Sequence, residues 1–291
     1  MIKGVILGFV CYASYAISDS FVKLIGEGLD SNEILCLGAA LMLTAVPFLK
    51  GRDDHWGDLI RAKKPGLWLL RAMAGAISSL SSVMAFKALP MAEAFSLIFL
   101  MPIFVTILSV IFLHEHVGWR RWSAVVVGFI GVLVVLRPGF RQLSKGHADA
   151  FVCALVSAIS VIALRLAGND EKRINLYGAG VIGPLVIGAI LMLPAFKWPS
   201  MLQWVFLLGY GLLAGLGAII LMFASRLVPV SIVAPTQYSQ MLWAVVLGYV
   251  LFHDKVDWPM GVGIGLILSA GLFTLLRENQ VSNWWKRVKW L

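Results

Sequence analysis

Charged residues are scarce in this sequence: Asp, Glu, Lys and Arg make up only 13% of the 291 residues, while 60% are hydrophobic. A soluble domain of this size could not bury so much apolar surface, so lipid must supply most of the solvent. Cysteines are few and odd in number, because only Cys11, Cys36 and Cys153 occur, all within apolar segments. Without a CxxC pattern or an even set, we expect neither a disulfide framework nor a cysteine metal site. The composition indicates a protein that crosses a membrane many times.

Acidic residues are fewer than basic ones, 15 against 24, which gives a net charge of +9. In a soluble protein this balance would suggest nucleic acid as a partner, but in a membrane protein it follows from basic loops held in the cytoplasm. We therefore expect no nucleic-acid binding. In the segment His114-Glu115-His116 the two imidazoles are two residues apart, so they point to different sides of a helix. The sequence predicts no enzyme, no catalytic residues, no metal site and no cofactor.

Ten apolar segments, each about long enough to cross a bilayer as a helix, follow one another along the chain. They fall at residues 3–26, 33–49, 66–87, 91–113, 120–137, 147–167, 174–196, 202–226, 229–252 and 259–277. Most Lys and Arg residues between them lie on the side of the N-terminus, which places both termini in the cytoplasm. We expect an all-α integral membrane protein with ten transmembrane helices, multi-pass in a bacterial-type inner (plasma) membrane and in contact with membrane lipid.

Part of the sequence is used twice. Residues 85–119 recur in outline at 224–258, without gaps, at an offset of 139 residues (253 − 114). Scarce residue types coincide in this alignment: Pro90, His114 and Trp119 match Pro229, His253 and Trp258. Glu115 matches Asp254, so the pattern predicts a repeated helix end. Helix 1 and helix 6 align likewise at an offset of 142 residues, which brings Lys23 opposite Arg165 (165 − 23).

Two repeats of five spans each constrain the orientation of the chain. Because five is odd, the second repeat must enter the membrane from the opposite side. We expect residues 1–140 to form the first five-helix repeat and residues 141–278 the second, inverted repeat. Residues 279–291 are predicted to be an aromatic and basic tail on the cytoplasmic surface. Inverted repeats are typical of transporters that work by alternating access.

The drug/metabolite transporter superfamily, in its ten-helix EamA-type branch, is the family that this sequence resembles. The resemblance rests on ALPMAEAFSLIFLMPIFVTILSVIFLHEHVGWRRWSAVVVGFIGVLVVLRPG at 88–139 and on its echo in the second repeat. Pro102 meets the family pattern of a mid-helix proline. In the second copy the proline is Pro235, whereas Met241 is the partner of Pro102, which predicts that helix 9 bends at a different depth from helix 4.

The resemblance implies a secondary active transporter of a small polar organic metabolite across the cytoplasmic membrane by alternating access, with proton coupling left open. The expected cargo is S-adenosylmethionine-, vitamin- or amino-acid-like. Alternatives are an exporter of multiple drugs or toxic organic compounds and, more remotely, a non-transporting membrane scaffold or lipid-handling protein. A ten-helix chain can enclose a pathway by itself, so the sequence is compatible with a monomer and with a homodimer.

Ionisable side chains inside a membrane cost at least ~2.5 kcal/mol each, so each needs a partner, a water-filled cavity or a function. Asp19 and Lys23 are four residues apart on helix 1, which places them on one face and predicts a pair. Lys87 and Glu93 flank the start of helix 4 and should lie at the same outer depth. We expect one cluster, in which the two acids bind substrate or protons and the two lysines form a gate or ion pairs. A static set of salt bridges is the alternative.

Helix 9 carries the most polar stretch inside the membrane, at residues 235–240. Its consecutive hydrogen-bonding side chains do not all fit a lipid face, so at least one of Gln237, Tyr238 and Gln240 should line a cavity between the repeats and bind substrate. On helix 3, Arg71 can bind an anionic group through its planar guanidinium or extend to the headgroups. Weaker candidates for substrate contact are Tyr15, Ser82, Ser96 and Trp243.

Overall fold

The structure is a computed structural model that describes residues 2–137, 142–167, 171–227 and 233–288, and within these ranges it contains helices and no strands. Within these ranges, seven helical segments are long and apolar enough to cross a membrane: Ile2–Ile25, Ser31–Leu49, Pro65–Ala88, Met91–Phe112, Lys145–Ala167, Arg173–Ala195 and Met201–Ala224. Two further apolar helices, Trp122–Leu136 and Trp258–Phe273, are shorter than a usual span. The structure confirms the expected class, an all-α integral membrane protein.

Helix boundaries in the first half, residues 2–137, follow local signals. The Asp30 carboxylate accepts a hydrogen bond from the Asn32 backbone N–H at 2.8 Å and caps the next helix. Pro65 opens another helix, where its missing N–H costs no hydrogen bond. The elements are α1 (Ile2–Ile25), η1 (Gly26–Gly28), α2 (Ser31–Met42), η2 (Leu43–Ala45), α3 (Val46–Leu49), η3 (Trp56–Leu59), α4 (Pro65–Ala88), α5 (Met91–Ile98), α6 (Met101–Phe112) and α7 (Trp119–Leu136).

The second half, residues 142–288, has a similar order of helices. Its elements are α8 (Lys145–Ala167), α9 (Arg173–Met192), η5 (Leu193–Ala195), α10 (Met201–Leu227), η6 (Ala234–Tyr238), α12 (Ser239–Phe252) and α13 (Trp258–Val288). α13 runs without a break past residue 278, where the sequence predicts a separate tail. The last three residues of that tail lie outside the described ranges.

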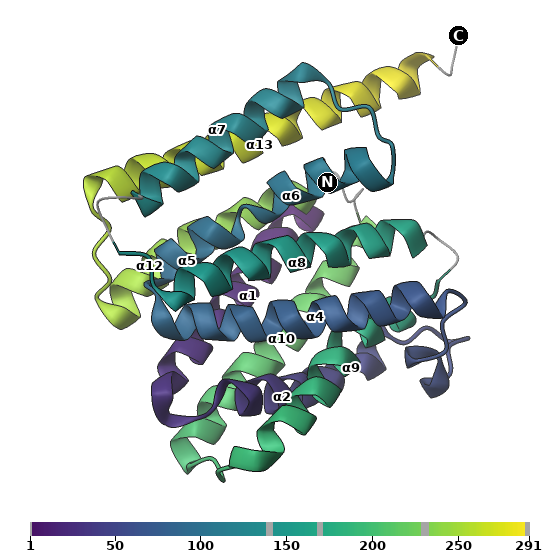
Figure 1. Cartoon of the computed structure of the whole chain (residues 1–291). Helices are drawn as coiled ribbons and strands as arrows, with labels where there is room; N and C mark the ends of the chain where they lie inside the picture. The colour runs from purple at the N-terminus through teal and green to yellow at the C-terminus, as the bar shows by residue number, and fades with distance from the viewer. Residues whose placement is uncertain (1, 138–141, 168–170, 228–232, 289–291) are drawn as a thin grey trace.

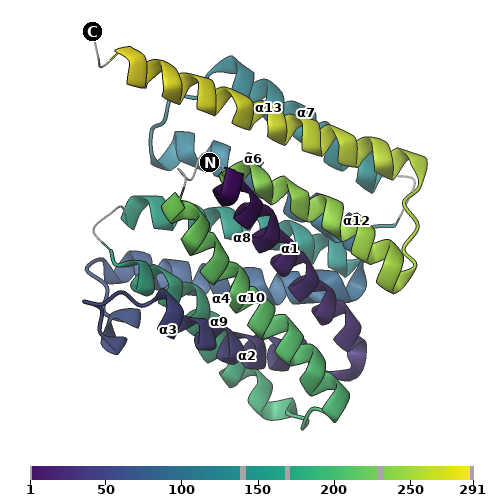
Figure 2. The same ribbon diagram turned by 180° about the vertical axis from the view of Figure 1, so that it is seen from behind.

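The two halves pack against each other through equivalent pairs of helices. α1 of the first half packs against α10 of the second, and α8 of the second half packs against α4 of the first. α2 contacts α9, and α7 contacts α13. Figures 1 and 2 show that the α7–α13 pair forms one edge of the bundle and the α2–α9 pair the opposite edge. The interior therefore consists of helices from both halves, side by side.

The centre of the bundle is a pair of helix interruptions that come into contact. Helix 4 of the sequence is broken between α5 and α6 at Phe99 and Leu100, and η6 precedes α12 in the second half. At the offset of 139 residues, Phe99 corresponds to Tyr238 (238 − 99), and the two rings stack with their centroids 5.5 Å apart. Pro235 lies at the start of η6, which begins at Ala234 and ends at Tyr238, the residue equivalent to the first break. The prediction that helices 4 and 9 bend at different depths stays a prediction.

The predicted repeated helix end is confirmed. His114 after α6 and His253 after α12 both adopt the left-handed conformation, with φ of 52° and 55°. The backbone N–H of Glu115 bonds to the Ser109 carbonyl at 3.3 Å, and that of Asp254 bonds to the Gly248 carbonyl at 3.0 Å. The two helices thus terminate alike, and each presents an acidic side chain just beyond its last turn.

Glycine allows α7 and α13 to approach closely at one point. A Cβ on Gly263 would lie 2.6 Å from the Gly131 carbonyl oxygen, whereas a Cβ on Gly261 or Gly265 would meet nothing within 4 Å. Of the three glycines in this part of α13, only the middle one is required by packing.

We expect Gly263→Ala to lower the free energy of unfolding by about 1–3 kcal/mol, because backbone must move to admit the methyl group. Gly265→Ala on the same helix should be neutral or stabilising by up to about 1 kcal/mol, since alanine is the better helix former. Thermal denaturation of detergent-purified protein measures both. Equal loss of stability in the two variants would contradict the close approach of α7 and α13.

Candidate functional site

Asp19 and Gln240 meet where the two halves join. Asp19 lies on α1, and Gln240 lies in the first turn of α12, directly after η6. The Gln240 side-chain amide donates a hydrogen bond to the Asp19 carboxylate, with Nε2 and Oδ2 3.2 Å apart. Among the described residues, Asp19 forms no ion pair with a lysine, arginine or histidine. The structure thus brings two of the sequence-predicted site residues together, with no cationic partner for the carboxylate in the part of the chain that the structure describes.

Aromatic side chains lie near this pair on both elements. Tyr15 precedes Asp19 by one turn of α1, and its ring packs beside Tyr12 with centroids 6.1 Å apart and against Gly217 of α10. Tyr238, two residues before Gln240, stacks on Phe99. Each residue of the Asp19–Gln240 contact thus has a tyrosine close to it in sequence, one in the first half and one in the second.

Most hydroxyl groups of the polar stretch at 235–240 are used locally. Thr236 donates to the Val233 carbonyl at 2.6 Å, and Ser239 donates to the Thr236 carbonyl at 2.6 Å. Both side chains are buried, whereas Gln237 and Gln240 are only half-buried. Neither glutamine amide is hydrogen-bonded to a described residue of this stretch, and that of Gln240 bonds to Asp19.

A row of small polar residues fixes α1, and with it Asp19, against α10. Cys11, Ser14 and Ser18 follow the spacing i, i+3 and i+7, so they share one face of the helix. Their side chains donate to the backbone carbonyls of Gly217, Leu213 and Tyr210, at 3.3, 2.7 and 2.7 Å. Sequence reasoning missed this row, although its helical spacing is visible in the sequence.

The predicted cluster of Asp19, Lys23, Lys87 and Glu93 does not form as one unit. Lys23 pairs with Asp254 at 2.9 Å instead of with Asp19, and its ammonium lies 4.6 Å from the centroid of the Phe252 ring. Lys87 donates to the Leu29 carbonyl at 2.8 Å. The spacing of four residues places Asp19 and Lys23 on one face correctly, but the long lysine side chain reaches the end of α12.

Glu93 is engaged by a residue that the sequence analysis did not select. Its buried carboxylate lies 3.0 Å from Nε2 of His147 on α8. The other ring nitrogen of His147 is 2.8 Å from the Ser144 hydroxyl and 2.9 Å from the Ser144 backbone N–H. This arrangement joins the start of α5 to the start of α8, and it does not include Asp19.

Three weaker candidates lie away from the Asp19–Gln240 pair or have their polar group occupied. Ser96 is fully buried and donates to the Ala92 carbonyl of its own helix at 2.7 Å. Trp243 shares the exposed face of α12 with Val246 and Val250, which suits a lipid contact. Ser82 is half-buried on α4, one turn from Ser78, whose hydroxyl is 2.7 Å from that of Ser157 on α8.

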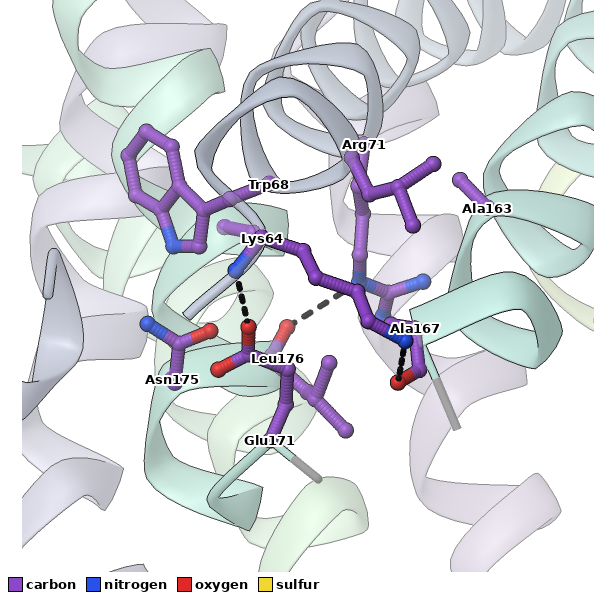
Figure 3. Close-up of a pocket in the computed structure, with 10 residues that line it drawn as sticks. Lys64, Trp68, Arg71, Ala163, Ala167, Glu171, Asn175 and Leu176 are labelled. Atoms are coloured by element: carbon purple, nitrogen blue, oxygen red, sulfur yellow. Dashed lines mark hydrogen bonds between the residues drawn. The ribbon is translucent and has the colours of Figure 1, made fainter. Parts of the chain in front are cut away.

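Arg71 joins three helices at the other end of the bundle. Its guanidinium donates to the Leu176 carbonyl of α9 at 3.1 Å and to the carbonyl and hydroxyl oxygens of Ser160 on α8, each at 3.2 Å. Lys64, next to α4, donates to the Ala167 carbonyl at 3.1 Å. Figure 3 shows both side chains reaching across to α8 and α9. The positive charges here thus serve to hold backbone carbonyls.

A small pocket lies between these side chains, with about 220 Å³ of empty space that includes open solvent. Trp68, Glu171 and Asn175 are among its lining residues, and the Glu171 carboxylate accepts from the Lys64 backbone N–H at 2.7 Å (Figure 3). Asn175 is buried, and its side-chain oxygen has no hydrogen-bond partner. The volume falls below the usual range of about 300–1,000 Å³ for organic ligands, so the pocket suits water better than a metabolite.

Ion pairs hold the loop before α4 against the start of α9. Lys172, just before α9, lies 2.5 Å from the Asp58 carboxylate and 3.4 Å from that of Asp54. The hydrogen bond from Lys172 lowers the pKa of Asp58, and the same bond raises the pKa of Lys172. The Asp58 carboxylate therefore contributes stability at pH values above its ordinary pKa, and the Lys172 ammonium contributes stability at pH values below its ordinary pKa. Both contributions are present throughout the neutral range, so these ion pairs remain formed there.

Comparison with known proteins gives the family of this chain. A profile described as the EamA-like transporter family matches it twice, at residues 2–137 and 144–276. The chain belongs to the EamA-like transporter family. This family is part of the drug/metabolite transporter superfamily, and its members are transporters of the membrane rather than enzymes. The resemblance read from the sequence is confirmed.

Relatives of this EamA-like transporter carry metabolites. The S-adenosylmethionine uptake transporter of Rickettsia felis is 24% identical over 267 residues, which cover 92% of this chain and 90% of the relative. The riboflavin transporter of Rhizobium johnstonii is 26% identical over 237 residues, or 81% of this chain and 78% of the relative. A protein of known crystal structure, 15% identical, shares the fold with a TM-score of 0.63, covering 97% of this chain and 99% of that one. The chain is thus a multi-pass membrane transporter of this family.

Because the Arg71 guanidinium donates to carbonyl groups of α8 and α9, we expect Arg71→Met to lower the free energy of unfolding by about 1.5–3 kcal/mol. Arg71→Lys keeps the charge but not the planar fork, so it should recover only part of this loss. Chemical or thermal unfolding of the purified variants measures the effect. A normal stability of Arg71→Met combined with loss of ligand binding would instead assign Arg71 to the substrate site.

Proposed function

We propose that this EamA-like transporter is a secondary active transporter of a small, polar, positively charged organic metabolite, which binds at Asp19 between the two halves. The observation that carries the proposal is the Asp19 carboxylate, held by the Gln240 amide and without a cationic partner among the described residues. Gln237, Tyr238 and Tyr15 complete the proposed site. Substrate exchange would follow an alternating-access cycle.

Electrostatics supports a cation at this position. A carboxylate in an apolar bundle is costly unless a positive charge or a proton compensates it. Of the other carboxylates near this end of the bundle, Asp254 is paired with Lys23 and Glu93 contacts His147, while buried Glu33 accepts a hydrogen bond from the Lys197 backbone N–H and has no ion pair among the described residues. Asp19 differs from Glu33 in lying beside the half-buried Gln240 amide of the other half, so a substrate cation would be favourable there, and a proton would take its place when the substrate leaves.

The neighbouring side chains fit an organic cation better than a simple ion. Amides such as Gln240 and Gln237 offer donors and acceptors to polar substituents, while the Tyr15 and Tyr238 rings offer stacking faces and cation–π contacts. S-adenosylmethionine, the cargo named for several relatives, carries a sulfonium and an ammonium group beside an aromatic base. It is the first cargo to test.

The exchanged packing of the halves supports alternating access as the mechanism. α1 lies on α10 as α8 lies on α4, which is the arrangement that two inverted repeats related by a pseudo-two-fold axis would produce. Asp19 and Gln240 come from opposite halves, so a rocking of one half against the other would change access to them. Both termini would lie in the cytoplasm, as the basic loops indicate.

The test is a thermal-shift series on detergent-purified protein with S-adenosylmethionine, riboflavin, amino acids and hydrophobic organic cations. A ligand at ten times its dissociation constant should stabilise the protein by RT ln 11, about 1.4 kcal/mol, if it binds only the folded state. Asp19→Asn should weaken binding of a cationic ligand by about tenfold or more, equivalent to about 1.4 kcal/mol. Uptake into proteoliposomes then establishes transport.

Glu93→Gln is the matched control, since it neutralises another membrane carboxylate, one that is paired with His147. It should leave the ligand-induced shift intact. Binding that is unchanged in Asp19→Asn would refute the proposed site. A response to hydrophobic organic cations alone, with none to metabolites, would favour an exporter of multiple drugs.

A further inference from the structure

Two ion pairs at opposite ends of the bundle are related by the internal repeat. Lys23 on α1 pairs with Asp254 after α12, and Arg165 on α8 pairs with Glu115 after α6. The sequence offsets relate them member by member, because Lys23 corresponds to Arg165 (165 − 23 = 142) and Glu115 to Asp254 (254 − 115 = 139). Each pair joins the first half of the chain to the second.

The pairs lie at opposite ends of the bundle. Figures 1 and 2 both show the ends of α1 and α12 on one side and the ends of α6 and α8 on the other. We call the Lys23–Asp254 contact the outer latch and the Arg165–Glu115 contact the inner latch, following the orientation that the basic loops predict.

The two latches are not equally closed. In the outer latch the charged atoms are 2.9 Å apart, and the side chains are only 16% and 15% exposed. In the inner latch the distance is 3.5 Å, and both side chains are 39% exposed. The structure is therefore tight at the outer end and loose at the inner end.

The outer latch also holds the start of a helix in the opposite half. The Asp254 carboxylate accepts a hydrogen bond from the Met91 backbone N–H at 3.0 Å, in the first turn of α5. A negative charge is favourable at this position, where the N–H groups of a helix lack partners. Opening the outer end would thus require Asp254 to release both Lys23 and α5.

We propose that the outer and inner latches are the two alternating closures of the transport cycle: each must break for its own end to open, and weakening one shifts the protein toward closure by the other. This proposal rests on the alternating-access cycle proposed above. Both contacts are formed in the structure, so it corresponds to a state in which neither end is open and the outer latch is the shorter and more buried of the two. The reason is the internal repeat, which relates the two contacts to each other. A motion in which the two halves exchange their conformations would therefore also exchange the states of these two contacts.

The test is backbone hydrogen exchange of the full-length protein in detergent, followed by mass spectrometry. Residues 89–95 and 250–257 report on the outer end, and residues 110–118 and 160–166 on the inner end. Lys23→Met should raise exchange at the outer end and lower it at the inner end, each by at least about twofold, because it shifts the population of two states. Arg165→Met should produce the opposite changes.

Conservative variants are the matched controls. Lys23→Arg and Arg165→Lys keep the charges and should exchange like the wild type. Arg137→Gln removes another ion pair at the outer end, between Arg137 and Asp257, which joins α7 and α13. These helices pack along their length, so this variant should change exchange only locally.

If Lys23→Met fails to fold because Asp254 is left without its cation, the double variant Lys23→Met with Asp254→Asn removes both charges and gives the same readout. A change confined to the mutated end, or changes of the same sign at both ends, would overturn the proposal and make the pairs static ties. The readout needs no substrate. Opposite changes at the two ends in a protein that binds and transports no tested cargo would refute the proposed cargo but not the latches.

Discussion

Polar groups inside a membrane must find their partners within the protein, and in this chain several of those partners lie across the division between its halves. Ser14 and Ser18 bond to α10, Ser78 bonds to Ser157, and Arg71 bonds to carbonyls of α8 and α9. The ion pairs at both ends follow the same rule. Lipid competes for none of these contacts, so the polar groups specify how the halves fit together while apolar surface faces outward.

The same constraint explains the place of the candidate site. Two helices are interrupted at equivalent positions, and the rings of Phe99 and Tyr238 stack where the interruptions meet. An interrupted helix can be tolerated at membrane depth only where protein surrounds it. Gln240 follows directly after one interruption and reaches Asp19 on α1. The local irregularity of the chain and a carboxylate that has no ion pair among the described residues therefore occur together, between the halves.

The repeat could be read from the sequence, but the partners of its charged residues could not. Matching prolines, histidines and tryptophans predicted two equivalent helix ends, and His114 and His253 have the same left-handed conformation. Helical spacing predicted that Asp19 and Lys23 share a face, yet Lys23 extends to Asp254, 231 residues away. The prolines predicted irregularities in helices 4 and 9, and both helices are interrupted, at Phe99 and Leu100 and at η6.

The sequence by itself determined the class, the family and the repeated helix end, because composition, length and the order of residues along one helix are local properties. Only the tertiary structure decided that Lys23 belongs to Asp254, that Glu93 belongs to His147, and that Asp19 has Gln240 as its partner. These contacts join residues far apart in the chain. Their choice depends on which helices lie side by side and on how far each side chain reaches, and neither can be read from spacing along a single helix.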